Sequence, residues 1–378
     1  MKLILSRKFI LKLKQIQIYN LRGMDSRRII NNFVELVKIY SPSLMEDFVF
    51  EYLAKKFREL GIISELQVNG KIKNMIGFIE GNDKTKEPIF FCAHADTVEP
   101  SKGIEPIIDE ENGMIKSSGN TILGADDKAG ITAMLELAYH LREEPHSKYG
   151  DIYLIITSAE EIGLVGARHL DISRIKAKYG YCLDSHGEVG TAVIKGATHY
   201  RFSVECIGKS SHAGIDPEKG INAIKMSAYM IDRLPSGIID EETVMNIGEI
   251  KGGKATNIVP DNVVFEGEIR SFKNEKIQKE IEKIYQLANE TKEKFKGDIK
   301  INIEKLYEGY EIPEDSPIVK KYVDTCYKIG IKPVLTSTRG GSDANILNSK
   351  GLQTLNISCG MRNPHSTEEF IYIRDLLN

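Results

Sequence analysis

The sequence predicts an α/β protein in which a smaller α+β domain is inserted into a larger domain that has a mostly parallel mixed sheet between helices. Two observations lead to this prediction. Continuous apolar runs, such as residues 88–97 and 151–161, alternate with helical patterns, which is typical of strands covered on both faces. Between residues 198 and 307 several strand-like segments instead alternate apolar and polar residues, which is typical of a sheet with one exposed face.

The composition is that of an ordinary globular protein. The chain has 378 residues, 41% hydrophobic and 28% charged, with a net charge of -3. This balance gives no reason to expect nucleic acid or a membrane as a partner. The five cysteines form no C-x-x-C pair, and Cys92 and Cys182 lie in apolar strand-like runs. We therefore expect reduced, buried thiols and a cytoplasmic protein without a transmembrane span.

Residues 1–23 form a basic, amphipathic N-terminal extension ahead of Met24. A signal peptide needs an uninterrupted apolar stretch, and Lys12 and Lys14 break the one found here. We interpret the segment as a non-essential extension, with Met24 as an alternative start. An amphipathic targeting or membrane-touching segment is the alternative interpretation.

The elements of the larger domain follow one another in βαβ fashion. The first helix, over residues 24–40, has Asp25 or Ser26 as its cap, and a second amphipathic helix ends at Gly61. A strand over 74–81, a buried strand over 88–97, a long helix over 128–144 and another buried strand over 151–161 follow. The pattern resumes later with a helix over 316–330 and strands over 332–338 and 352–358.

The inserted domain is predicted from the order strand, helix, strand, strand, helix, strand, which is that of a small α+β domain. The corresponding segments are residues 199–208, 222–234, 243–253, 262–272, 274–295 and 298–307. We therefore expect a discontinuous catalytic domain formed by residues 24–197 and 308–378, and an inserted domain formed by residues 198–307.

Histidine and carboxylate residues stand where the apolar runs end. His94 and Asp96 end the run 88–97, Glu160 and Glu161 end the run 151–161, and Asp184 ends YGYCLD. Groups just past the carboxyl ends of parallel strands converge on one crevice. Imidazole and carboxylates without a thiolate are ligands for zinc or a similar divalent ion in hydrolytic sites.

Each of these residues also has a structural interpretation. His94 and Asp96 share one face of a strand, so Asp96 can orient a metal-binding imidazole, although an ordinary core histidine would fit as well. Asp126 precedes a helix; it or Asp127 can cap that helix, or Asp126 can bridge two metal ions.

The adjacent Glu160 and Glu161 repel each other at the end of a buried strand, which costs several kcal/mol unless cations or donors compensate. One can bind a metal while the other takes a proton from water, whereas a solvated loop pair is the alternative. Asp184 and His365 point to a site through their joint occurrence with the others.

The motifs HADT, NTILGADDKAG, AEEIG, LD and the late PH together resemble the metallopeptidase family of aminoacylase, acetylornithine deacetylase and peptidase T. The similarity is greatest to the peptidase T (tripeptide aminopeptidase) branch and covers nearly everything from Met24 onwards. It implies a di-zinc exopeptidase-like catalytic domain with an inserted ferredoxin-like lid and dimerisation domain. It also implies an aminopeptidase that acts on tripeptides or other short peptides. An N-acyl amino acid deacylase of the same family is the alternative.

The resemblance implies a role for each matching residue. Two zinc ions, or cobalt or manganese in their place, would be bridged by Asp126. One ion would be held by His94 and Asp184, and the other by Glu161 and His365. Glu160 would be the general base for a metal-activated water, and Asp96 would orient His94.

In the inserted domain, the resemblance places His212 where the family has a histidine that polarises the scissile carbonyl. In dimeric relatives this histidine comes from the neighbouring subunit. Asn257 would face the substrate, and the lid would form a homodimer. Arg270 and Arg339 are candidate clamps for the C-terminal carboxylate of a short peptide. A polar turn is the alternative interpretation for His212, and surface salt bridges are the alternative for the arginines.

Overall fold

The computed structural model describes residues 25–378, and the predicted extension of residues 1–23 lies outside them. The described chain forms two compact units, each with its own core. The first unit contains the described residues up to Ile194, Glu311–Ser337 and Ser342–Asn378. The second unit contains Lys195–Tyr310 and Thr338–Gly341.

The first two helices of the first unit have the cap and the terminating glycine that the sequence predicts, although α2 is shorter than the predicted range of residues 24–40. Asp25 is the cap of α2 (Ser26–Val37), and its carboxylate accepts hydrogen bonds from the amides of Arg27 and Arg28. Helix α3 (Asp47–Leu60) ends at Gly61, whose φ of 74° is the left-handed conformation that favours glycine. Both predictions are confirmed.

A nine-stranded mixed sheet forms the centre of the first unit, in the order β1-β2-β6-β3-β7-β16-β8-β14 with β15 paired to β8. The neighbours β6, β3, β7 and β16 are parallel, whereas β1, β2 and β8 pair antiparallel. The α/β class with a mixed sheet is therefore confirmed. The strands are β1 (Ile63–Asn69), β2 (Ile72–Ile79), β3 (Ile89–His94), β6 (Ile152–Thr157), β7 (Tyr179–Ser185), β8 (Thr191–Gly196), β14 (Tyr310–Glu311), β15 (Val334–Thr338) and β16 (Gln353–Ser358).

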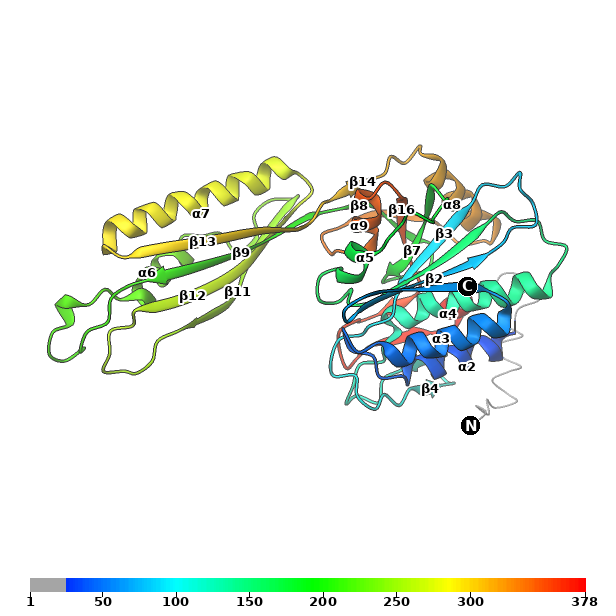
Figure 1. Ribbon diagram of the computed structural model, residues 1–378, viewed down its shortest axis with the longest axis horizontal. Coiled ribbons are helices and arrows are strands. Elements are labelled where there is room, and N and C mark those ends of the chain that lie inside the picture. Colours follow the sequence, from blue (N-terminus) through cyan, green and yellow to red (C-terminus); the bar gives the residue numbers. More distant parts are fainter. Residues whose placement is uncertain (1–24) are drawn as a thin grey trace. The chain divides into compact units, whose positions relative to one another are not determined.

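Helices cover both faces of this sheet. Figure 1 shows α2, α3 and α4 (Ala125–Glu143) on one face, and α5 (Val165–His169), α8 (Pro317–Lys328) and α9 (Asp343–Ser349) on the other. All six residues of β6 are buried, as the apolar run predicts. A small second sheet was not apparent from the sequence; it contains β4 (Ile107–Asp109), β5 (Met114–Lys116), β17 (Met361–Arg362) and β18 (Phe370–Tyr372), and the chain ends with α10 (Ile373–Leu377).

The second unit has the predicted order of strands and helices around a five-stranded antiparallel sheet, β10-β11-β12-β9-β13. Helices α6 and α7 pack over residues such as Phe202 and Phe265 to form its core. The elements are β9 (Thr198–Ile207), the short 3-10 helix η1 (Pro217–Lys219), α6 (Ala223–Ile231), β10 (Gly237–Ile238), β11 (Thr243–Gly252), β12 (Asn262–Ser271), α7 (Asn274–Phe295) and β13 (Asp298–Tyr307).

Two further expectations concern the whole described chain. All five cysteines are free thiols, and four of them, including Cys92 and Cys182, are buried. Among residues 25–378, no helix has both the length and the apolar character that crossing a bilayer requires.

The parallel strands β3 and β7 can lie side by side because Gly180 has no side chain. A Cβ atom at this position would lie 2.2 Å from the Phe90 carbonyl oxygen, a backbone atom that cannot move aside. We expect Gly180→Ala to lower the free energy of unfolding by about 1–3 kcal/mol, measured by chemical denaturation. Gly248→Ala is the control, because the nearest atom to its added Cβ is 3.4 Å away. Equal stability of the two variants would contradict this account.

Candidate metal centre

The predicted ligands meet at the carboxyl ends of the parallel strands. His94 is the last residue of β3 and lies in register with Thr157, the last residue of β6. Glu160 and Glu161 follow β6, and Asp184 lies near the end of β7. Because these three parallel strands are neighbours, the residues at their ends share one edge of the sheet.

One carboxylate joins the two predicted halves of the site. Oδ1 of Asp126 lies 3.0 Å from Nε2 of His94, and its Oδ2 lies 3.5 Å from Nε2 of His365. Oδ1 of Asp184 is 3.7 Å from the same His94 nitrogen, and Oε2 of Glu161 is 3.0 Å from that of His365. The structure therefore brings all five predicted ligands together, with Asp126 between one imidazole–carboxylate pair and another.

Asp127 has a different environment from its neighbour Asp126. Its Oδ2 accepts a hydrogen bond from the amide of His94 at 3.2 Å, and its Oδ1 accepts one from the amide of Gly130 at 3.1 Å. A ligand atom of Asp127 also lies within 4.8 Å of those of His94 and Asp184. Because both of its oxygens bind backbone amides, Asp127 anchors the start of α4 to β3.

Asp96 organises more of the site than the sequence indicates. Nδ1 of His94 donates to the main-chain oxygen of Asp96 at 3.0 Å and lies 3.4 Å from its Oδ1, so Nε2 is left for a metal. The Asp96 carboxylate also accepts hydrogen bonds from the amides of Glu160 at 2.9 Å and Glu161 at 3.1 Å. Ser43 donates to its Oδ2 at 2.6 Å. Asp96 thus fixes the imidazole and the backbone of both glutamates at once.

Burial is the main influence on the pKa values of the site carboxylates, and the charges of their neighbours add to it or oppose it. Burial raises the pKa of Glu160 well above its ordinary range, and the charge of Asp184 raises it further. Burial likewise raises the pKa of Asp184 to about 7. Burial also opposes ionisation of Asp126, but hydrogen bonds from His365 and His94 outweigh it and lower its pKa. Divalent cations would stabilise the ionised forms of all these groups.

The residues present fit a pair of divalent cations. Oε1 of Glu161 is buried and has no hydrogen-bond partner within the described part of the chain, which is costly for a carboxylate unless a cation binds it. The potential ligand atoms are imidazole nitrogens and carboxylate oxygens without a thiolate, a set typical of hydrolytic zinc and related metals. The described residues therefore include a candidate metal-binding centre.

Glu46, Lys128 and Asp343 are polar groups beside the centre that the sequence did not single out. Glu46 accepts hydrogen bonds from the amides of Leu44 and Ala159, both at 2.9 Å, and so ties the loop before α3 to the segment that carries Glu160. Lys128 is fully buried and donates to the Ala95 carbonyl between His94 and Asp96. The third is Asp343, which accepts a hydrogen bond from Thr157 and leaves a buried Oδ1 without a partner. The signal for Lys128 was its place in ADDKAG, whereas no pattern singled out the other two.

The second unit places His212 and Asn257 on adjoining loops. The amide of Ala213 donates to the Asn257 carbonyl at 3.0 Å, and the amide of Gly214 donates to Nδ1 of His212 at 3.1 Å. Because Nδ1 accepts, the neutral ring carries its proton on Nε2, which is left as a donor. A cavity of about 250 Å³ lies alongside, and its lining includes Ala213, Thr256 and Ile258.

The two arginines also lie together in the second unit, but they differ in free hydrogen-bonding capacity. Nε and Nη2 of Arg270 both donate to the Glu268 carboxylate at 3.0 Å, and its Nη1 donates to the Arg339 carbonyl at 3.1 Å. Arg339 donates through Nη2 to the Glu241 carbonyl, and its buried Nε has no partner in the described structure. The fork of Arg270 is thus occupied by Glu268.

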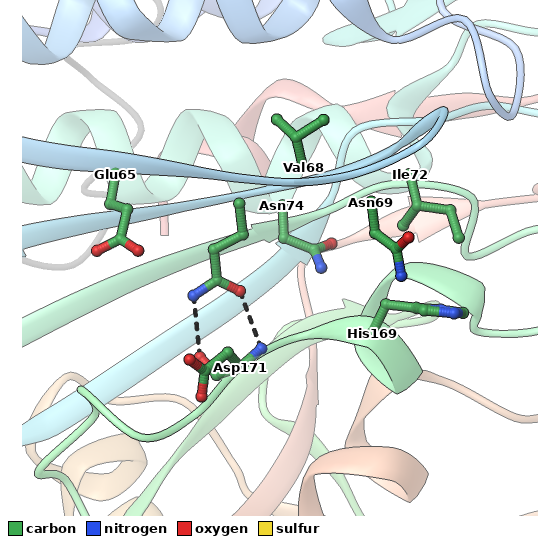
Figure 2. A pocket seen from close by; sticks show the side chains of 8 residues that line it. Glu65, Val68, Asn69, Ile72, Asn74, His169 and Asp171 are labelled. Carbon is green, nitrogen blue, oxygen red and sulfur yellow. Dashed lines mark hydrogen bonds between the residues drawn. The ribbon is translucent and has the colours of Figure 1, made fainter.

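A separate hollow of about 270 Å³ lies beside β1 and β2 and contains none of the predicted site residues. Gln67 and Asp171 exchange two hydrogen bonds. Figure 2 shows Asp171, Asn69 and His169 around this hollow. Its walls are polar, but its acidic and histidine side chains do not form a cluster of potential metal ligands. It is therefore distinct from the metal centre.

Comparisons with known proteins identify peptidases as relatives of this chain. The family model Peptidase dimerisation domain matches residues 194–296, and Peptidase family M28 matches residues 74–204. The chain is 31% identical to Peptidase T of Clostridium perfringens over 292 residues, which are 74% of this chain and 69% of the relative. Two solved structures are also similar, and each match covers 93% of this chain and 95% of the chain in the solved structure. They are aminopeptidase PepT from Bacillus cereus (38% identity, TM-score 0.84) and a tripeptidase from Staphylococcus aureus (33% identity, TM-score 0.89).

We expect Asp96→Asn to weaken divalent-metal binding by about 10–100-fold, measured by calorimetric titration of the metal-free protein with Zn²⁺. Asn keeps one acceptor oxygen, so its NH₂ group necessarily faces one of the two amides, of Glu160 or Glu161, that donate to Asp96, and that hydrogen bond is lost. Asp83→Asn, a change in an exposed turn of the same unit, serves as the control. Unchanged affinity in Asp96→Asn would show that this carboxylate does not organise the centre.

Proposed function

Because this chain belongs to the peptidase T family, we propose that it is a metal-dependent aminopeptidase that releases N-terminal residues from tripeptides and other short peptides. The observation that carries the proposal is the position of Asp126 between two imidazole–carboxylate pairs. This arrangement suits two metal ions about 3.5–4 Å apart, the separation of co-catalytic pairs.

We assign the ligands by their proximity. His94 and Asp184 would hold one ion, His365 and Glu161 would hold the other, and Asp126 would contribute one oxygen to each. We propose zinc in both positions, with Co²⁺ or Mn²⁺ as alternatives, because imidazole nitrogen and carboxylate oxygen bind all three metals.

Glu160 is the candidate general base. When bound, the two cations would lower the pKa of a shared water molecule and polarise the scissile carbonyl. The Glu160 carboxylate then takes a proton from the attacking water and transfers it to the nitrogen of the leaving amine. Asp96 holds the backbone of Glu160 in place by accepting a hydrogen bond from its amide.

We propose that residues 198–307 act as a lid that supplies substrate contacts. His212 has its Nε2–H available to donate to the oxygen of the reacting carbonyl, and Asn257 lies on the adjoining loop. Arg339 is the proposed partner of a peptide's C-terminal carboxylate; its Nε donor has no partner among the described residues but is buried, so the guanidinium must turn to present it. Arg270 supports Arg339 by donating a hydrogen bond to its carbonyl oxygen. For Arg270 to bind substrate directly, as predicted, its guanidinium must first separate from the Glu268 carboxylate.

We further propose a homodimer formed through the lid. The short strand β10 pairs only with Val244 and Met245 of β11, so the rest of that edge has no neighbouring strand among residues 25–378. Ile250, which lies on this edge, is 55% exposed. Light scattering should give twice the 42.4 kDa mass of one chain. We expect Ile250→Lys to give monomers, because a charged residue on a strand edge opposes pairing. Ile63→Lys, at an exposed residue of the first unit, is the control. A monomeric wild-type protein would contradict the dimer.

We expect Glu160→Gln to lower kcat on tripeptides by about 10²–10⁴-fold without loss of bound metal, because the amide has the size of the carboxylate but cannot take a proton. The measurement is hydrolysis of a tripeptide panel with added Zn²⁺, Co²⁺ or Mn²⁺, together with the metal content of each sample. Glu136→Gln is the control, since Glu136 is a buried glutamate of α4 that pairs with Arg28.

Near wild-type turnover by Glu160→Gln would rule out this base. The same panel with N-acetylated peptides separates the two activities considered for the family. An aminopeptidase loses activity when the N-terminus is blocked, whereas a deacylase acting on N-acyl groups does not.

A further inference from the structure

The turn that carries His365 also carries a buried glutamate whose role the proposed function leaves open. Glu369 is 1% exposed. Its Oε2 accepts hydrogen bonds from the amides of Leu123 and Gly124, both at 2.7 Å, and its Oε1 accepts one from the amide of Asp126 at 3.1 Å. Three backbone donors therefore compensate the burial of this carboxylate.

The segment that Glu369 binds cannot satisfy its own amides. Helix α4 begins after Gly124, which is in the left-handed conformation with φ of 73° and has no side chain that could accept hydrogen bonds from the amides of residues 123–126. Within the helix, Asp127 accepts a hydrogen bond from the amide of Gly130, which lies beyond those residues. Asp126 also departs from helical geometry, with φ of -80° and ψ of 108°. Amides at the start of a helix need acceptors from elsewhere, and Glu369 supplies them from a distant part of the chain.

The backbone of the His365 turn is itself constrained. Asn363 and His365 both have positive φ, 51° and 61°, which ordinary residues seldom adopt. The turn is closed by a hydrogen bond from the amide of Glu369 to the Ser366 carbonyl, and the amide of Ser117 donates to the Glu369 carbonyl. Glu369 is thus bonded to both segments that present a ligand, the one with Asp126 and the one with His365.

We propose that Glu369 is a positioning residue that sets the place of Asp126 relative to His365, and so the spacing of the two metal sites. The inference rests on the metal centre of the proposed function. Asp126 is the residue common to both sites, so a small displacement of its backbone disturbs both sites together. Glu369 binds no substrate in this account and acts through the loop of residues 123–126.

Metal titration tests this role without peptide hydrolysis. We expect metal-free Glu369→Gln to bind Zn²⁺ at least about tenfold more weakly than wild type in calorimetric titration, because the amide NH₂ would face backbone donors. Its Co²⁺ absorption spectrum should change, because the ligands are displaced. In the metal-free variant, the amides of Leu123, Gly124 and Asp126 should exchange hydrogen faster than in wild type.

Glu136→Gln is the matched control, because it alters another buried glutamate on α4 that binds Arg28 and not the loop. It should lower the Tm while leaving Zn²⁺ affinity and the Co²⁺ spectrum unchanged. Wild-type affinity and spectrum in Glu369→Gln would overturn the proposal. Should that variant fail to fold, Glu369→Asp decides by the same titration: a tenfold loss supports the role, and wild-type affinity overturns it.

These readouts separate the inference from the proposed function. A wild-type protein that binds two metal ions but hydrolyses no peptide would contradict the aminopeptidase and leave the role of Glu369 intact. A wild-type protein that binds no metal would contradict both.

Discussion

The fold brings a group of buried carboxylates together at one edge of its central sheet, and their negative charge must be compensated. Asp96, Asp127 and Glu160 are less than 9% exposed, and the side chains of Glu161 and Asp184 are 7% and 9% exposed. The ion-pair partners of the site carboxylates in the described structure are His94 and His365 rather than lysine or arginine. Such a group of carboxylates is strongly unfavourable unless cations bind to it, and this need connects the fold to metal-dependent hydrolysis.

The protein manages this charge by giving its buried carboxylates two different kinds of partner. Asp127 and Glu46 each accept two hydrogen bonds from backbone amides. Asp96 accepts two such bonds and a third from the Ser43 hydroxyl. These groups hold loops in place and have little capacity left for a metal. Asp126 and Glu161 instead face imidazoles, and Glu161 retains an oxygen without a partner. Backbone donors therefore distinguish the carboxylates that build the site from those that are free to bind.

The sequence predicted the α/β class and singled out the residues that meet at the candidate metal centre, and the reason is physical. Apolar runs that end in His94, Glu160 and Asp184 identify parallel strands, and topology places the ends of such strands together. Roles that depend on backbone contacts could not be read in this way. The sequence allowed either Asp126 or Asp127 to cap the helix, and only the amides of His94 and Gly130 select Asp127.

The order of the elements and the kinds of side chain at their ends follow from the sequence alone, because periodicity and residue chemistry are local properties. The tertiary structure decided which groups meet. Ser43 and Asp96 are 53 residues apart, and Glu369 and Asp126 are 243 residues apart, and nothing in the local pattern of either pair indicates contact. The small sheet formed by β4, β5, β17 and β18 escaped the sequence for the same reason, since two-residue and three-residue strands have no period of their own and depend on their distant partners.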